Sequence, residues 1–210
     1  PPALADARPV GMVREPSATT REVLRRIAGL LTPVLRNDLR PRALQPCVPD
    51  VASFPLAAWK RCVNRSLAQD AARSGLWFGA PAGVSALREQ TARHLALTME
   101  LHCRAEQVII VNSTPQAYDL IARVLLEPGD MVAVEDPAHA SIARILALNH
   151  LRVRGVPHDD EGLSVRELDA RAPEAAAVFL HSVNSYPMGI DTTPSRSLEL
   201  LRWADRSGAW

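Results

Sequence analysis

The sequence predicts an α/β protein of three layers, in which helices cover both faces of a mainly parallel sheet. Short apolar runs typical of buried strands alternate along the chain with longer stretches of helical periodicity. Several of these stretches begin at a serine, threonine or proline start signal soon after a strand ends. Strands separated by helices in this way form βαβ units, whose strands run parallel.

Four apolar runs are predicted to be strands, at residues 108–111, 131–134, 151–156 and 177–181. The first consists of four consecutive β-branched residues, which predicts a strand buried on both faces. Asn112, Ser113 and Thr114 follow it and supply an N-cap, and Pro115 suits the first position of a helix. The chain is therefore expected to run from this strand directly into a helix.

Helices are predicted over residues 56–72, 85–101, 117–126 and 194–206, and around Ile142 and Leu146. Ser85 is expected to cap the second of them. Ser164 and Glu167 have the capping-box spacing and predict a further short helix. Thr193 starts the last helix, and Gly208 ends it.

The composition is that of a soluble globular protein, with 47% hydrophobic residues, 22% charged residues and a net charge of +1. This balance predicts no broad attraction for nucleic acid, and no apolar run approaches the roughly 20 residues of a membrane helix. The first residues lack the order of a signal peptide, so a cytoplasmic location is expected. Cys47, Cys62 and Cys103 are too far apart for a C-x-x-C pair, which argues against a disulfide framework or a zinc site.

Two regions are expected. Residues 1–45 are rich in proline and arginine and indicate a linker with one short helix, whereas residues 46–210 carry the alternating strands and helices. Lys60 is the only lysine, so it is the single candidate for chemistry that needs an amine. It lies beside the apolar stripe of a predicted helix, where a solvent-facing lysine is the commoner interpretation.

Three loops lie at the predicted carboxyl ends of strands, where parallel sheets bind ligands: residues 112–116, 135–139 and 181–189. In the first loop, the unpaired N–H groups of the following helix favour a phosphate or carboxylate, with the Ser113 and Thr114 hydroxyls as further donors. A capped helix without a ligand explains the same residues equally well. The chain has neither G-x-G-x-x-G nor G-x-x-x-x-G-K, which excludes two common nucleotide-binding loops.

Seven short motifs follow one another along the chain. They are FPLAAW at 54–59, FGAPAG at 78–83 with Leu87-Arg88, EQVII at 106–110, QAYDL at 116–120, EPGD at 127–130, VEDP at 134–137 and PMG at 187–189. Their order resembles the pyridoxal-phosphate (PLP) aminotransferase-like domain of MocR-type regulators in the GntR superfamily, and more distantly class I/II aminotransferases. The resemblance covers residues 46–210 and implies that they form the N-terminal part of the large domain of fold type I transferases. It also likens residues 1–45 to the linker that follows the winged helix in that family.

This resemblance implies a cofactor site and partners. Ser113 and Thr114 match the Gly-Ser pair that holds the cofactor phosphate. His139 matches an aromatic residue that stacks on the pyridine ring, and Asn184 lies in the loop on the cofactor's hydroxyl side. The resemblance further implies a homodimer, an amine or amino acid ligand in the intact protein, and DNA binding only through a winged-helix module outside this chain.

Several residues depart from the family pattern. Pro115 stands where a glutamine is usual and removes an N–H, and Phe78 lacks the hydroxyl of the usual tyrosine. His139 is a smaller, titratable stacking surface, and Ala80 and Val84 replace an aspartate and a tyrosine. Together these departures predict weak or absent PLP binding.

Three interpretations follow from the resemblance. The first is the N-terminal part of the PLP-fold effector domain of a MocR-like transcriptional regulator, and the second is part of a stand-alone class I/II aminotransferase. The third is a degenerate domain that binds no cofactor. In the family, the Schiff-base lysine and the aspartate that pairs with the pyridine nitrogen come after the segment that matches residues 207–210. This chain is therefore expected to be inactive by itself, and Lys60 is not assigned that role.

Overall fold

The computed structural model describes residues 17–18, 21–22, 25, 49–68 and 78–210. It divides into two compact units, Pro1–Val34 with Pro115–Trp210 and Leu35–Thr114, which are described separately below. Most of the predicted linker at residues 1–45, including most of its short helix, lies outside the described residues.

The first unit contains a four-stranded sheet with the order β3-β2-β1-β4. β1 (Met131–Asp136) pairs in parallel with both β2 (Arg152–Asp159) and β4 (Ala177–Phe179). β3 (Gly162–Leu163) pairs antiparallel with β2. The predicted mainly parallel sheet is confirmed, and β3 was not predicted because two residues are too few to show a strand period.

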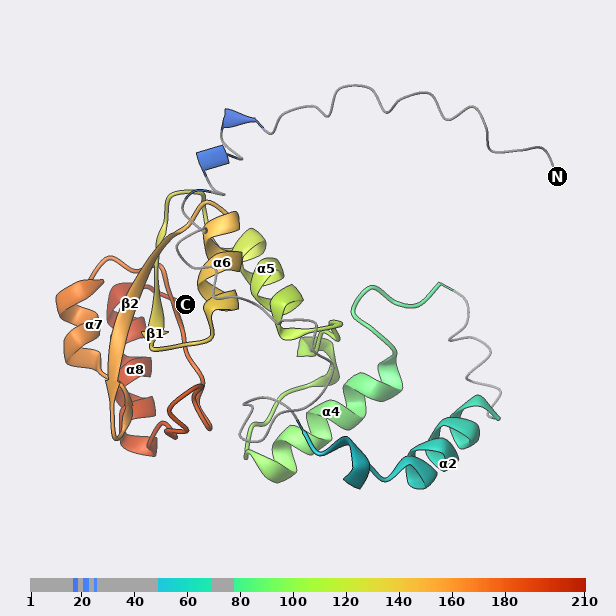
Figure 1. The fold of residues 1–210 in the computed structure, drawn as a ribbon. Coiled ribbons are helices and arrows are strands. Elements are labelled where there is room, and N and C mark those ends of the chain that lie inside the picture. The colour runs from blue at the N-terminus through green and yellow to red at the C-terminus, as the bar shows by residue number, and fades with distance from the viewer. Residues whose placement is uncertain (1–16, 19–20, 23–24, 26–48, 69–77) are drawn as a thin grey trace, which may run out of the picture. The chain divides into compact units, whose positions relative to one another are not determined.

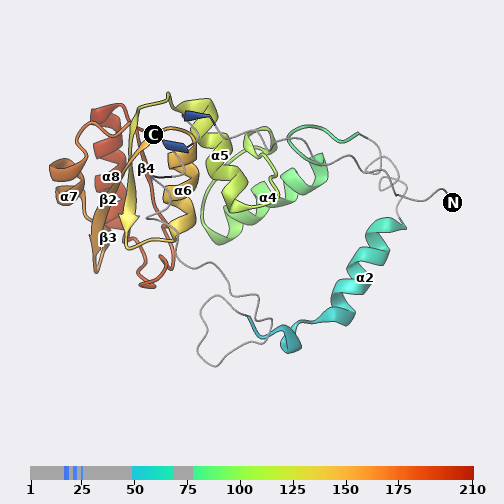
Figure 2. The same cartoon turned by 45° about the horizontal axis from the view of Figure 1, so that its top comes forward.

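Helices cover both faces of this sheet, as Figure 1 shows. α5 (Thr114–Leu125) and α6 (Ala140–Leu148) lie on one face, whereas α7 (Val165–Arg171) and α8 (Pro194–Ser207) lie on the other, and the second view in Figure 2 agrees. The three-layer arrangement predicted from the sequence is therefore confirmed for this unit.

Alternate side chains of β1 enter two separate cores. Val132 and Val134 pack with residues of α5 and α6, while Met131 and Ala133 pack with residues of α7 and α8. Successive side chains of a strand point to opposite faces, so a central strand between two helix layers must be apolar at every position. The apolar run at residues 131–134, the first four residues of β1, follows from this double burial.

Local start and stop signals set the limits of α7 and α8. The Ser164 hydroxyl accepts a hydrogen bond from the N–H of Glu167, and the Thr193 hydroxyl accepts one from the N–H of Arg196. Gly208 ends α8 in the left-handed region at φ 69°, where a residue without a side chain is favoured. These predicted signals are confirmed.

In the described residues of the second unit, 49–68 and 78–114, the structure has the helical segments η1 (Val51–Ser53), α2 (Leu56–Leu67), α4 (Ser85–Thr98) and η2 (Ala105–Gln107). Arg88 ties α4 to its surroundings, because Nε donates to the carbonyl oxygen of Gly83 and Nη1 donates to that of Ala105. The predicted cap at Ser85 is wrong, since Val84 occupies the N-cap position and Ser85 is the first helical residue.

The strand predicted over residues 108–111 is also wrong, because the chain is irregular there. A strand needs a neighbour for its backbone hydrogen bonds, and none of the four strands of the described sheet pairs with this run. The N–H of Ile110 donates instead to the carbonyl oxygen of Ala82. Gly83 makes this approach possible, since a Cβ there would lie 2.8 Å from Cβ of Ile110.

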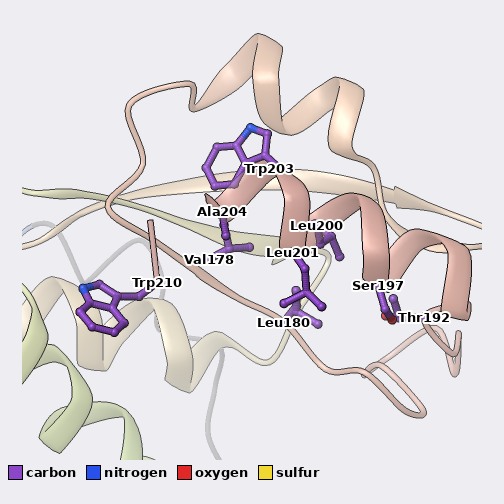
Figure 3. Close-up of a pocket in the computed structure, with 9 residues that line it drawn as sticks. All are labelled: Val178, Leu180, Thr192, Ser197, Leu200, Leu201, Trp203, Ala204 and Trp210. Atoms are coloured by element: carbon purple, nitrogen blue, oxygen red, sulfur yellow. The ribbon is translucent and has the colours of Figure 1, made fainter. Parts of the chain in front are cut away.

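A groove of about 290 Å³ runs between β4 and α8 (Figure 3). Its lining is almost entirely apolar and comprises Val178, Leu180, Thr192, Ser197, Leu200, Leu201, Trp203, Ala204 and Trp210. Beside the groove, the N–H of Trp210 donates to the carbonyl oxygen of Ala176, and the N–H of Val178 donates to that of Trp210. This is the pattern of one parallel rung on the open edge of β4. None of the predicted site residues lines the groove.

Candidate functional site

The carboxyl ends of β1 and β4 lie side by side, because the two strands are parallel neighbours in the sheet. The loops that leave them lead into α6 and α8 and contain two of the three segments predicted to meet a ligand. This edge, defined by residues 135–139 and 181–191, is called the rim below.

At the rim, the buried Glu135 pairs with the half-buried His181. Oε2 of Glu135 lies 2.9 Å from Nδ1 of His181, and the side chains are 2% and 30% exposed, respectively. An ionised carboxylate can only accept hydrogen bonds, so Nδ1 is the nitrogen that carries the proton. The carboxylate thus fixes both the orientation and the tautomer of the imidazole.

The same carboxylate affects the pKa of Tyr118, on α5. Burial, and then the negative charge of Glu135, raises the pKa of the Tyr118 phenol above its ordinary value of 10.0. The ring also packs edge to face against Phe179 of β4, with 5.6 Å between the ring centroids. α5 and β4 are therefore joined beside the buried pair.

Replacing Glu135 with glutamine is expected to lower the pKa of Tyr118 while leaving it above 10.0, because burial is the larger cause and persists. The pKa can be measured by ultraviolet titration in a Tyr186→Phe background, where Tyr118 is the only tyrosine left. Asp119→Asn is the matched control and should leave this pKa in place. An unchanged titration in Glu135→Gln would contradict the arrangement of Tyr118 and Glu135.

His139, predicted to stack on a ring, caps the start of α6. Its Nδ1 accepts a hydrogen bond from the N–H of Ser141 and lies 2.7 Å from the hydroxyl oxygen of that residue. Nδ1 therefore carries no proton, and Nε2 is the protonated nitrogen of the neutral ring. The imidazole lies against the phenol ring of Tyr186, with 5.5 Å between the centroids. The two rim loops meet through these rings.

Asn184, the other predicted site residue of the rim, adopts the left-handed conformation at φ 50°, which asparagine tolerates better than most residues. Its N–H donates to Oδ1 of Asp191, and the loop closes further where the N–H of Ser185 donates to the carbonyl oxygen of Ile190. These bonds hold the loop in a defined shape. The structure records no contact between Asn184 and His139 among the described residues.

Ser113 and Thr114 lie at the beginning of α5, a helix of 12 residues. Both are exposed, and Thr114 is already the first helical residue, so the helix begins one residue before Pro115, the predicted first position. They belong to the unit that ends at Thr114, whereas His139 and Asn184 belong to the other. Lys60 lies exposed on α2.

The sequence prediction named both loops of the rim, but it did not single out four residues within or beside them: Tyr118, Glu135, His181 and Tyr186. Glu135 and His181 are 46 residues apart, and their pairing depends on β1 and β4 being neighbours. A signal was nevertheless present, because Glu135 is a charged residue at the end of an apolar strand predicted to be buried.

This fold is that of the large domain of fold type I transferases. It matches the crystal structure of Pyrococcus horikoshii kynurenine aminotransferase in complex with PMP, with a TM-score of 0.70 at 23% identity over 93% of this chain and 47% of that one. The model of the family described as aminotransferase class I and II matches residues 48–210. The chain therefore belongs to the aminotransferase class I and II family.

Transcriptional regulators are prominent among the similar curated proteins. The probable rhizopine catabolism regulatory protein MocR of Rhizobium meliloti is 27% identical over 80% of this chain and 34% of its own length. Aromatic-amino-acid aminotransferase 1 of Thermococcus litoralis is 24% identical over 76% of this chain and 40% of its own length. The chain spans about a third of the length of the regulators that it matches. Within the described residues, every helix is too short or too polar to cross a bilayer.

Proposed function

We propose that this chain is part of a PLP-binding, aminotransferase-like effector domain of a MocR/GntR-type regulator that senses an amine or an amino acid. The observation that carries the proposal is the pair of exposed hydroxyls, Ser113 and Thr114, at the start of α5. A helix start with added hydroxyl donors is suited to a phosphate group. Similarity to MocR over 80% of this chain supports the regulatory role.

The side chains at the start of α5 suit the phosphate of PLP, and those at the rim suit its ring. Ser113 and Thr114 would hold the phosphate together with N–H groups of the first turn of α5, although Pro115 provides none. His139, braced by Tyr186, would give the pyridine ring an aromatic surface. When bound, PLP supplies an aldehyde that reacts with amines. The side chains named here contribute binding and orientation, and Lys60 is given no part in the chemistry.

The proposal is tested by comparing PLP with pyridoxal, which is the same aldehyde without the phosphate. The wild-type chain should bind PLP more tightly, and the Ser113→Ala/Thr114→Ala double variant should lose about a hundredfold or more of that preference, since hydrogen bonds to a charged group contribute about 1.5–3 kcal/mol each. Tryptophan fluorescence or calorimetry measures the affinities.

The matched control is Thr91→Ala/Thr98→Ala, which removes two hydroxyls that donate to carbonyl oxygens of their own helix, α4. This variant should keep the wild-type preference for PLP. Equal affinities for PLP and pyridoxal in the wild type would refute a phosphate site at α5.

A class I/II aminotransferase is the second candidate, favoured by the similarity to the Thermococcus litoralis enzyme. The regulator proposal includes a homodimer, a cytoplasmic location and a winged-helix module in the longer protein that would bind DNA. Sequencing the gene upstream distinguishes the two candidates. An in-frame winged helix supports the regulator, whereas a start codon close to this segment, with no such module, supports the aminotransferase.

A further inference from the structure

The outer edge of β4 is only partly paired. Trp210 makes one rung there, because its N–H donates to the carbonyl oxygen of Ala176 and its carbonyl oxygen accepts from the N–H of Val178. The next two backbone groups on this edge are the carbonyl oxygen of Val178 and the N–H of Leu180. Neither has a hydrogen-bond partner in the described part of the protein. β4 therefore offers one further rung of a parallel ladder.

Beyond this open rung, the edge is covered by Thr192. Its N–H donates to the carbonyl oxygen of Ser182, and its hydroxyl donates to that of His181. The open part of the edge thus lies between Trp210 and Thr192. It has room for a short extended segment and not for a long strand.

The open rung lies beside the apolar groove between β4 and α8, which has a volume of about 290 Å³ (Figure 3). Val178 and Leu180 line the groove from β4 and pack on the core that α7 and α8 share. On α8, Leu201 lines the groove and is 66% exposed. An extended apolar segment placed here would pair the free backbone groups and cover Leu201 at the same time.

The rung made by Trp210 fixes the direction and register of such a segment. Its two bonds are those of a parallel pair formed by Trp210 and Ala177. An extended chain that continues from Trp210 therefore runs along β4 toward Leu180. Its second residue would complete the open rung. Its first residue would share a face with Val178 and point into the groove, because paired side chains lie on the same side of a sheet.

We propose that the groove between β4 and α8 is filled by the residues that follow Trp210 in the longer protein, which join the sheet as a parallel strand beside β4. The inference rests on the proposed function only in placing this chain within a longer regulator, and PLP binding is not required. The segment supplies backbone partners to Val178 and Leu180. Its first side chain is apolar and covers Leu201.

The test compares the 210-residue chain with one extended by about ten further residues encoded by its own gene, enough for a short strand. Amide hydrogen exchange is the first readout. The N–H of Leu180 should exchange about tenfold or more slowly in the extended chain than in the 210-residue chain. The N–H of Val178, already bonded to Trp210, is the internal control and should be protected in both. Equal exchange at Leu180 in the two chains would overturn the proposal.

Stability provides the second readout. The extension should raise the melting temperature by about 4 °C or more. Leu201→Glu should cancel most of this gain, because the added segment would bury its carboxylate, whereas in the 210-residue chain it should change the melting temperature little. Leu198→Glu is the matched control, since Leu198 is 54% exposed on the same helix and does not line the groove. Equal gains in the two variants would contradict the proposal.

A second copy of the chain is the competing occupant of the groove. In that case, protection of Leu180 in the 210-residue chain would rise with protein concentration, and this result would overturn the proposal.

These outcomes are separate from the test of the proposed function. A gain in stability that Leu201→Glu abolishes, together with equal affinities for PLP and pyridoxal, would retain the added strand and refute the phosphate site. A stop codon directly after Trp210 would overturn the inference alone, because the phosphate site does not depend on this segment.

Discussion

Replacing Trp203 with alanine is expected to lower the free energy of unfolding by about 3–5 kcal/mol, the usual cost of removing a large buried aromatic side chain. Trp203 is 3% exposed and packs in the core between the sheet, α7 and α8. Its Nε1–H also donates to Oδ1 of Asp169 at 2.6 Å, which joins α8 to α7. Alanine would leave a cavity and an unpaired acceptor at the same place.

Urea denaturation measures this change, and two variants separate its causes. Trp203→Phe keeps most of the packing and loses the hydrogen bond, so it should cost about 1–2 kcal/mol. Trp210→Ala is the control, because that side chain is 67% exposed and its removal should stay within about 0.5 kcal/mol. A Trp203→Ala chain as stable as the Trp210→Ala chain would refute the described packing of α8.

Replacing Arg196 with alanine is expected to cost about 2–3 kcal/mol, since hydrogen bonds to charged groups are the stronger ones. The buried guanidinium makes a two-point contact with Asp159 and also donates to the carbonyl oxygens of Gly162 and Leu163. Further bonds reach Glu161 and Glu199. The Arg196 side chain therefore joins α8 to the β2–β3 hairpin. Truncation to alanine would leave the carbonyl oxygens of Gly162 and Leu163 without this donor.

The pH dependence of stability provides a check on this account. The hydrogen bonds from Arg196 hold the pKa of the Asp159 carboxyl below its ordinary value of 3.8. A carboxyl whose folded pKa is depressed stabilises the fold above its ordinary pKa, and this contribution is lost as the pH falls through the lower, folded value. Arg196→Ala should remove this part of the acid dependence, whereas Arg202→Ala, an exposed control on α8, should retain it. Equal stability and acid dependence in the two variants would contradict the role of Arg196.

Features encoded locally could be predicted from the sequence. Thr193 and Gly208 limit α8 through bonds to residues a few positions away, so the start and stop signals were sufficient. The apolar run of β1 has the composition that double burial requires, and the parallel sheet followed from the spacing of its strands.

Features that depend on distant neighbours could not be predicted in this way. Residues 108–111 have the composition of a strand, yet strand formation needs a pairing partner, which local sequence does not specify. The contacts of His181 with Glu135 and of His139 with Tyr186 arise because β1 and β4 are adjacent. Arg196 likewise looks like an ordinary helix-surface arginine until the hairpin folds against it.

The most direct test of the proposed PLP contacts, those at the start of α5 and those at the rim, is a PLP titration followed by amide NMR on the uniformly labelled chain. The account predicts that the shifted resonances belong to Ser113, Thr114, His139 and residues 181–191. Shifts confined to the groove beside α8, or to the surroundings of Lys60, would contradict it, as would a spectrum that PLP leaves unchanged.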